Sequence, residues 1–85
     1  MALSQADQDH IATAINWARQ FPVLGIPSDI SEHDCAIETR PVFHKVQEID
    51  GPIIWQESEW HVVIRNRWVI DLNTMGVPDG PPRQI

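Results

Sequence analysis

The stretch Trp60–Leu72, WHVVIRNRWVIDL, decides the fold. Apolar residues alternate with other residues on both sides of a central Arg-Asn-Arg, as in two strands joined by a tight turn. The register determines which side chains share a face. A two-residue turn would pair Val62 with Asp71, whereas a three-residue loop at Arg65–Arg67 places His61 opposite Asp71. We expect the three-residue loop, because it gives a wholly apolar face made of Trp60, Val62, Ile64, Trp68, Ile70 and Leu72.

The residues before this hairpin predict two further strands. Cys35–Thr39 and Val42–Val46 each alternate with a period of two, but the phase slips by one residue at Pro41. We expect a β-bulge at Pro41, which would keep both halves facing the same way. Asp50–Pro52 has the composition of a turn, and Ile53–Gln56 then predicts a short strand.

The N-terminal residues predict a helix over Ser4–Phe21. Ser4 is a good N-cap, the apolar residues Ile11, Ile15 and Ala18 recur at three- and four-residue steps, and Pro22 ends the pattern. We expect this helix to pack on the apolar face of the sheet.

The rest of the chain reads as irregular structure. Val23–Asp34 is rich in Gly, Pro and Ser and predicts a surface loop. Gly76–Ile85 predicts an extended or mobile tail. The expected architecture is an α+β domain over residues 1–75, with the helix packed on an antiparallel sheet of about four strands, followed by a Pro/Gly-rich tail at 76–85.

Composition excludes several classes of protein. The chain has 85 residues and a net charge of -6, so one small acidic domain is expected rather than a protein that binds duplex DNA. A single cysteine excludes an intramolecular disulfide framework. Met1–Gln20 lacks the basic start and apolar run of a secretory signal, so we expect a soluble, cytoplasmic protein that does not bind membranes.

Cofactor and metal sites are not expected either. The four glycines are scattered and form no phosphate-binding loop, which predicts no nucleotide cofactor. His33, Asp34 and Cys35 are potential metal ligands, and His44 and His61 lie elsewhere. Three consecutive residues of an extended chain rarely converge on one ion, so we predict no metal.

The negative charge is concentrated in the middle of the chain. Residues 29–59 hold eight acids and two bases, whereas the remaining residues are neutral overall. Such a segment steers association with a basic partner surface. We therefore expect a non-enzymatic binding or inhibitor protein that docks on a basic, nucleic-acid-binding surface of a larger protein and does not bind nucleic acid itself. The expected contact residues are Asp29, Glu32, Asp34, Glu38, Glu48, Asp50, Glu57 and Glu59, with Trp55 as an exposed aromatic anchor.

Two resemblances bear on function. In size and charge the chain resembles small phage-encoded inhibitors of host defence, such as anti-CRISPR proteins, and also immunity proteins and antitoxins. The run from His61 to Asp71 resembles the His–strand–turn–strand–Asp hairpin of papain-like and transglutaminase-like thiol enzymes. This second resemblance implies an alternative function, a minimal or decayed thiol hydrolase using Cys35, His61 and Asp71. In those families the nucleophilic cysteine opens a helix, whereas Cys35 opens a predicted strand.

Overall fold

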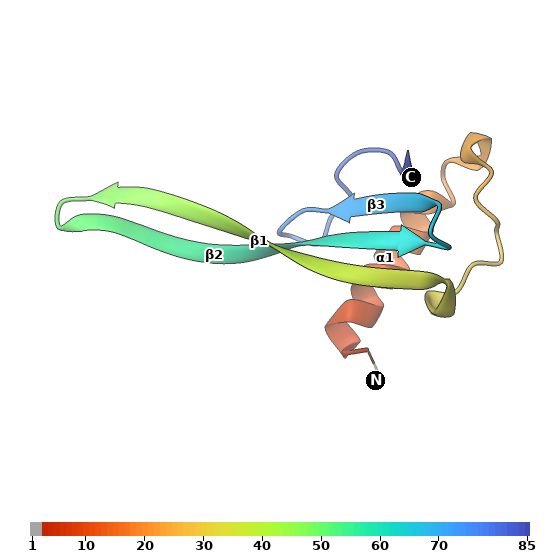
Figure 1. Ribbon diagram of the computed structural model, residues 1–85, viewed down its shortest axis with the longest axis horizontal. Helices are drawn as coiled ribbons and strands as arrows, with labels where there is room; N and C mark the ends of the chain where they lie inside the picture. Colours follow the sequence, from red (N-terminus) through yellow and green to blue (C-terminus); the bar gives the residue numbers. More distant parts are fainter. Residues whose placement is uncertain (1–2) are drawn as a thin grey trace.

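The computed structural model describes residues 3–85, apart from the side chains of residues 47, 48 and 53. A single helix packs on a four-stranded antiparallel sheet with the strand order β1-β2-β3-β4, so the predicted α+β class is confirmed (Figure 1). The elements are α1 (Gln5–Ala18), β1 (Cys35–Glu48), β2 (Gly51–Ile64), β3 (Trp68–Leu72) and β4 (Arg83–Gln84), with 3-10 turns at Pro22–Leu24 and Glu32–Asp34. Within the described residues, none of the helices is long and apolar enough to cross a membrane.

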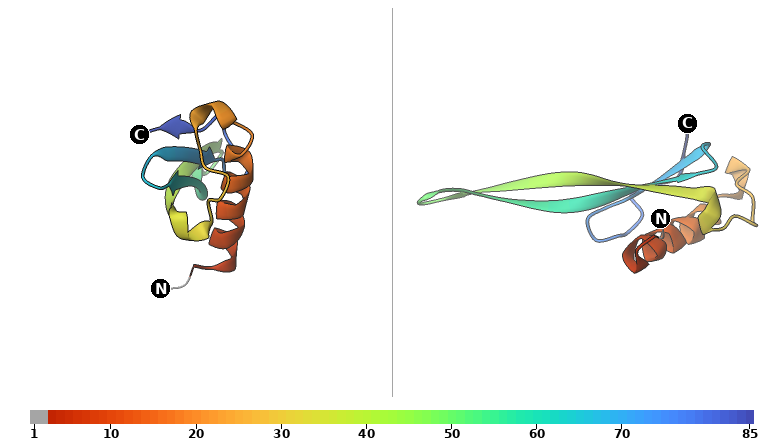
Figure 2. Two further views of the ribbon diagram at one scale, coloured as in Figure 1. Left: turned by 90° about the vertical axis from the view of Figure 1, so that its right-hand side faces the viewer. Right: turned by 60° about the horizontal axis from the view of Figure 1, so that its bottom comes forward.

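The helix begins and packs as predicted. The Ser4 Oγ accepts a hydrogen bond of 3.1 Å from the Asp7 backbone N–H, which satisfies one of the free donors of the first turn. The helix ends at Ala18, three residues earlier than Phe21. The helix lies along one face of the sheet (Figure 2), and its buried residues pack against that face. The core consists mainly of Ile11, Ala14, Ile15 and Ala18 from the helix and Val62, Ile64, Trp68, Ile70 and Leu72 from the sheet.

The decisive hairpin has the predicted register. Ile64 pairs with Trp68 and His61 pairs with Asp71, across a loop of three residues. Arg65 and Asn66 adopt φ angles of 48° and 56°, in the left-handed region that a tight hairpin of this twist requires. The apolar face therefore turns wholly toward the helix.

The predicted bulge at Pro41 is wrong. β1 and β2 pair residue for residue through this point, with Arg40 opposite Glu59, Pro41 opposite Ser58 and Val42 opposite Glu57. Proline fits here because β1 is an edge strand, where a missing N–H is tolerated. Because no bulge realigns the strand, the change of phase at Pro41 moves the alternating apolar residues of β1 from one face to the other.

The two halves of β1 consequently turn their alternating apolar residues to opposite sides. Cys35 and Ile37 pack against the core beneath the helix. Val42, His44 and Val46 lie on the other side of the ribbon, because successive side chains of a strand alternate.

The four strands differ from the four that the sequence suggested. The expected short strand at Ile53–Gln56 and the strand at Trp60 are one continuous element, β2. The fourth strand comes from the C-terminal segment, where Arg83 pairs with Val69. This segment is extended but held in place, because the Trp17 indole N–H also donates a 2.8 Å hydrogen bond to the Gly80 carbonyl.

The sheet has two unlike parts. Near the helix, β1 and β2 are joined by β3 and β4, and we call this part with α1 the base. Beyond it, β1 and β2 continue as a two-stranded ribbon, and we call Val42–Glu57 the distal arm (Figure 1). The arm gives the molecule extents of 53 × 30 × 18 Å.

The register also defines two faces of the β1–β2 ribbon. The helix face carries the side chains that point to the same side of the ribbon as Val62 and Ile64. Within the arm these are Phe43, Lys45, Ile54 and Gln56. The open face carries the alternate set, which in the arm includes Val42, His44, Val46, Trp55 and Glu57.

Candidate functional site

His61 and Asp71 form the predicted cross-strand pair on the open face of the base. The His61 Nδ1 lies 2.7 Å from an Asp71 carboxylate oxygen. The other carboxylate oxygen accepts hydrogen bonds of 2.8 and 3.1 Å from the Arg83 guanidinium. Arg83 is not predicted at this pair from the sequence, because residues 76–85 are expected to be extended or mobile. The Asp71 carboxylate thus fixes the orientation of the His61 imidazole, and the positive charge of Arg83 balances the charge of this carboxylate.

Cys35 is not brought to this pair. It is opposite Ile64, whereas His61 is opposite Glu38, so the two residues lie three pairs apart along the ladder and on opposite faces. Burial, with a smaller contribution from the charge of Asp34, raises the pKa of the Cys35 thiol to about 11. The thiol packs against the core, and its Sγ lies 3.5 Å from the Ser31 carbonyl oxygen as a weak hydrogen bond. A thiol held protonated at neutral pH, and away from the imidazole, is a packing group rather than a nucleophile.

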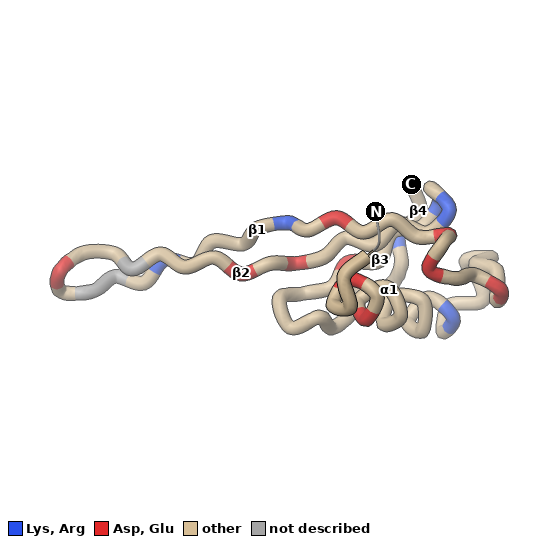
Figure 3. The backbone as a smooth tube through the Cα atoms, turned by 90° about the horizontal axis from the view of Figure 1, so that it is seen from below, with Lys and Arg blue, Asp and Glu red and all other residues tan. Residues whose placement is uncertain are grey.

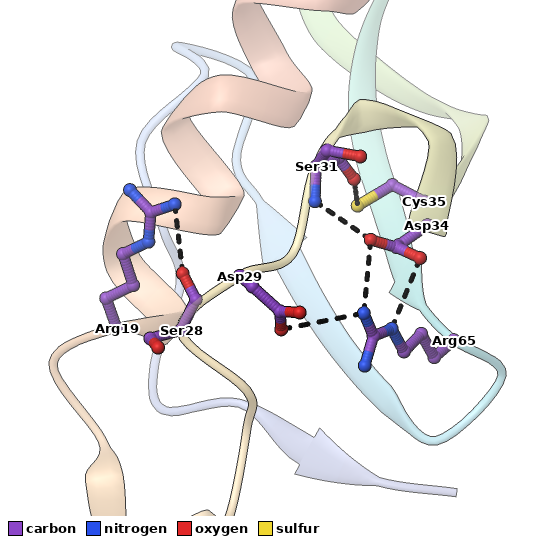
Figure 4. A network of polar contacts seen from close by, with 7 residues as sticks. All are labelled: Arg19, Ser28, Asp29, Ser31, Asp34, Cys35 and Arg65. Carbon is purple, nitrogen blue, oxygen red and sulfur yellow. Dashed lines mark hydrogen bonds and ion pairs between the residues drawn. The ribbon is translucent and has the colours of Figure 1, made fainter.

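Asp34 is the centre of a polar network at the end of the base (Figure 4). Its carboxylate accepts from the Ser31 backbone N–H at 2.9 Å and from the Arg65 Nε at 3.2 Å. The backbone N–H of Arg65 also donates to the Asp34 carbonyl, at 2.8 Å. The Ser31 hydrogen bond, followed by the Arg65 guanidinium, lowers the pKa of Asp34. Asp34 therefore fixes the hairpin loop to the 3-10 turn before β1.

The acidic residues of the segment 29–59 do not gather into one patch. Figure 3 shows them at both ends of the molecule and along β1 and β2 between. Asp29 and Asp34 lie near Arg65, with Asp29 at 3.7 Å from the guanidinium, and Glu32 is in the adjoining 3-10 turn. Asp50 is exposed in the β1–β2 turn, and the side chain of Glu48 lies outside the described part of the structure.

Glu38, Glu57 and Glu59 share the open face of the ribbon. These three carboxylates lie on alternate positions of paired strands, and Arg40 is opposite Glu59. They span the region from the base into the arm. Among the described side chains of the predicted acidic surface, these three are aligned on one side of the ribbon.

An exposed aromatic side chain lies next to these carboxylates. Trp55 is 43% exposed, which confirms the expectation that it is the exposed tryptophan. The His44 ring stacks on it, with ring centroids 5.0 Å apart and an interplanar angle of 19°. The His44 Nε2 is 2.9 Å from a Glu57 carboxylate oxygen, close enough for an ion pair although the angles are not those of a hydrogen bond. The open face thus combines an aromatic platform with a row of carboxylates.

The structure gives less support to a metal site or to a ligand pocket. No group of three or more His, Cys, Asp or Glu side chains among the described residues is arranged to hold a metal ion. A shallow pocket of about 290 Å³ lies between Leu24, Arg67, Trp68 and Ile85. It includes none of the residues of the His61 pair or the open face of the arm.

Comparison with other proteins adds no relative from which a role could be transferred. No family model matches the chain, and no curated protein or solved structure matches it either.

Proposed function

We propose that this chain is a small acidic, non-enzymatic binding protein that occupies a basic surface of a larger protein. The observation that carries the proposal is the open face of the β1–β2 ribbon, where exposed Trp55 lies beside a row of aligned carboxylates. In the base the helix packs on the opposite face, so it does not block the open face from a partner. Within the proposal the protein acts in the cytoplasm.

The chemistry of the open face fits a basic, nucleic-acid-binding partner. Carboxylates spaced along the β1–β2 ribbon present negative charge to the groove in which such a protein holds phosphates, and so imitate the charge of nucleic acid. Long-range attraction would speed the encounter, and the exposed indole would supply the buried anchor of the interface. Phage inhibitors of host defence and immunity proteins would act in this general manner.

The proposal assigns unequal roles to the predicted contact residues. Glu38, Glu57 and Glu59 contribute most, because the register aligns them with Trp55. Asp34 contributes least, because its carboxylate already accepts hydrogen bonds from Ser31 and Arg65. Asp29, Glu32 and Asp50 supply charge at the two ends of the surface.

A thiol hydrolase is not proposed. The geometry separates Cys35 from His61 by the thickness of the sheet, and the burial of the thiol raises its pKa. The His61–Asp71 pair serves instead as part of the open face.

The proposal is tested with two charge-reversed variants of equal net charge. The partner is first captured on the immobilised protein and identified, and its binding is then followed by surface plasmon resonance. In the test variant, Glu38→Lys and Glu57→Lys are combined on the open face. In the control, Asp9→Lys and Asp79→Lys reverse two exposed carboxylates outside the segment.

The test variant is expected to lose at least about tenfold in affinity, chiefly through the association rate, while the control changes it little. Binding of the unmodified protein should weaken as salt rises from about 0.05 to 0.5 M, because salt screens exposed charges. Equal effects of the two variants, or affinity independent of salt, would show that the acidic segment only keeps the protein in solution.

A further inference from the structure

Two of the four histidines lie on the open face, and each contacts a carboxylate there. The His44 Nε2 lies 2.9 Å from a Glu57 oxygen, and the His61 Nδ1 lies 2.7 Å from an Asp71 oxygen. Histidine is the side chain that ordinarily changes its charge near neutral pH. These two imidazoles therefore make the charge of the open face depend on pH.

His44 contacts both groups that the proposed function places in the arm's part of the interface. Its ring stacks on Trp55, and its Nε2 faces Glu57. This nitrogen is buried and makes no hydrogen bond within the described part of the chain. The His44 side chain as a whole is 36% exposed, so its ring exchanges protons with solvent. A proton on this ring creates an ion pair with Glu57 and a cation–π contact with the indole.

Protonated His44 would compete with a basic partner for the same groups. Glu57 would already be paired with a cation of its own chain, so an arginine or lysine of the partner would gain less from that carboxylate. The competing cation is absent when the ring is neutral.

His61 adds its charge among the carboxylates of the base. Its cross-strand neighbours are Glu38 in β1 and Asp71 in β3. With the Nδ1 hydrogen bonded to Asp71, a proton on the other ring nitrogen leaves this contact in place and adds one positive charge. The helix packs on the opposite face. The other charged side chains around His61 on the open face are Glu59, Arg40 and, bound to Asp71, Arg83.

The net charge of the open face is small enough for two protons to cancel it. Among the described strand positions of this face, four carboxylates stand against two guanidinium groups, namely Glu38, Glu57, Glu59 and Asp71 against Arg40 and Arg83. With neutral imidazoles the acids exceed the bases by two, and with both imidazoles protonated the two signs balance. Carboxylates ordinarily keep their charge down to about pH 4–5.

We propose that the open face is a pH-dependent binding surface, on which protonation of His44 and His61 weakens association with a basic partner. The inference rests on the proposed function and adds its regulation. The direction follows from the charges, because each proton removes one unit of negative charge from the surface that attracts the partner. Acid therefore releases the partner, and neutral pH permits binding.

An oligo-arginine peptide, acetylated at its N-terminus and amidated at its C-terminus, is the probe for this dependence. Its guanidinium groups stay charged at every pH used, so a change in binding comes from the protein alone. Fluorescence anisotropy of the labelled peptide measures binding at a constant ionic strength of about 0.05 M. The dissociation constant should rise at least about tenfold from about pH 7.5 to about pH 5.5.

The four histidines supply two matched variants. His44→Gln with His61→Gln removes both protonation sites of the open face, and its dissociation constant should change by less than about twofold between the two pH values. His10→Gln with His33→Gln removes the same number elsewhere and should keep the full change. His10 stacks on Trp60 beneath the helix, and His33 is exposed in the 3-10 turn. Circular dichroism at both pH values checks the fold of each variant.

Three results overturn the proposal. Binding of the unmodified protein could be the same at both pH values, or the change could persist in the variant at 44 and 61. Equal loss of the change in both double variants would assign the pH dependence to the charge of the whole chain.

The Glu38→Lys and Glu57→Lys variant separates these failures from that of the proposed function. If this variant loses the probe while the unmodified protein binds it equally at both pH values, the surface binds cations and only the pH dependence is wrong. If it binds the probe as tightly as the unmodified protein, or if the unmodified protein does not bind at about pH 7.5, the open face is no surface for a basic partner and both proposals fail.

Discussion

The base and the distal arm are built from the same two strands and differ in what covers them. In the base, alternate residues of β2 turn under the helix, and Val62 and Ile64 are 0% exposed. Ten residues earlier in the same strand, Ile54 is 62% exposed. The difference shows that two regularly paired strands can differ in stability along their length. The stability of each part depends on what packs against its faces.

The largest expected effect compares two isoleucines of β2. Ile64→Ala should lower the free energy of unfolding by about 2–5 kcal/mol, because it leaves a cavity in the core. Ile54→Ala should change it by less than about 0.5 kcal/mol at low micromolar concentration, because this side chain is exposed. Urea unfolding measures both. Similar losses would mean that the arm is packed as tightly as the base.

The next effect concerns the thiol at the start of β1. Its pKa of about 11 lies two units above the ordinary value of 9.0, so at pH 7 Cys35 should react about a hundredfold more slowly than in the unfolded chain. The reaction should quicken as the pH rises toward 11. Kinetics with a chromogenic disulfide, in the native state and in urea, measure this ratio. Fast native labelling that His61→Ala abolishes would show that the two residues do meet.

A smaller effect is the dependence of stability on pH, which we expect at the end of the base and not in the arm. Because hydrogen bonds to Ser31 and Arg65 lower the pKa of Asp34, the folded state gains stability from the charged carboxylate. This gain is complete above the ordinary pKa of 3.8 and is lost as the pH falls through the lower folded value.

The matched variants are Asp34→Asn and Asp50→Asn, the second in the turn of the arm. Thermal melts should show Asp34→Asn to be less stable than the unmodified protein at pH 7, with the difference shrinking below pH 3.8. Asp50→Asn should melt with the unmodified protein throughout. A pH-independent difference for Asp34→Asn would assign its effect to something other than the charge.

The smallest effect tests whether the C-terminal segment belongs to the base. Trp17→Phe removes the indole donor to the Gly80 carbonyl and should cost about 1 kcal/mol. The backbone N–H groups of Asp79 and Ile85, which donate to Asp71 and Arg67, should then exchange faster with solvent. Unchanged exchange at both would show that the segment is held without the indole.

The sequence alone predicts the structure correctly where capping residues, or the alternation of apolar residues around a turn, determine it. Ser4 set the start of the helix, and the apolar alternation around Arg65–Arg67 set the register that joins His61 to Asp71. Both rest on contacts between residues no more than ten positions apart along the chain. Such contacts depend little on the rest of the fold.

The sequence was insufficient where a choice depends on distant elements. The phase slip at Pro41 predicts a bulge only if one face of the strand is covered along its whole length, whereas the arm has exposed apolar side chains on both faces. The partners of Asp71 and Asp34 across the fold, Arg83 and Arg65, could not be identified from spacing. The pairing of Arg83 with Val69 likewise depends on a return of the chain that Gly and Pro residues permit but do not specify.

Amide hydrogen exchange along β2 tests most directly the claim that packing stabilises the base, whereas the two-stranded arm is only marginally stable. At low micromolar concentration, hydrogen-bonded amides within residues 60–64 should exchange only through global unfolding, and those within 54–58 should exchange at least about a hundredfold faster through local opening. Equal protection along the whole strand at low concentration would contradict the account, because the arm would then be stable without any partner.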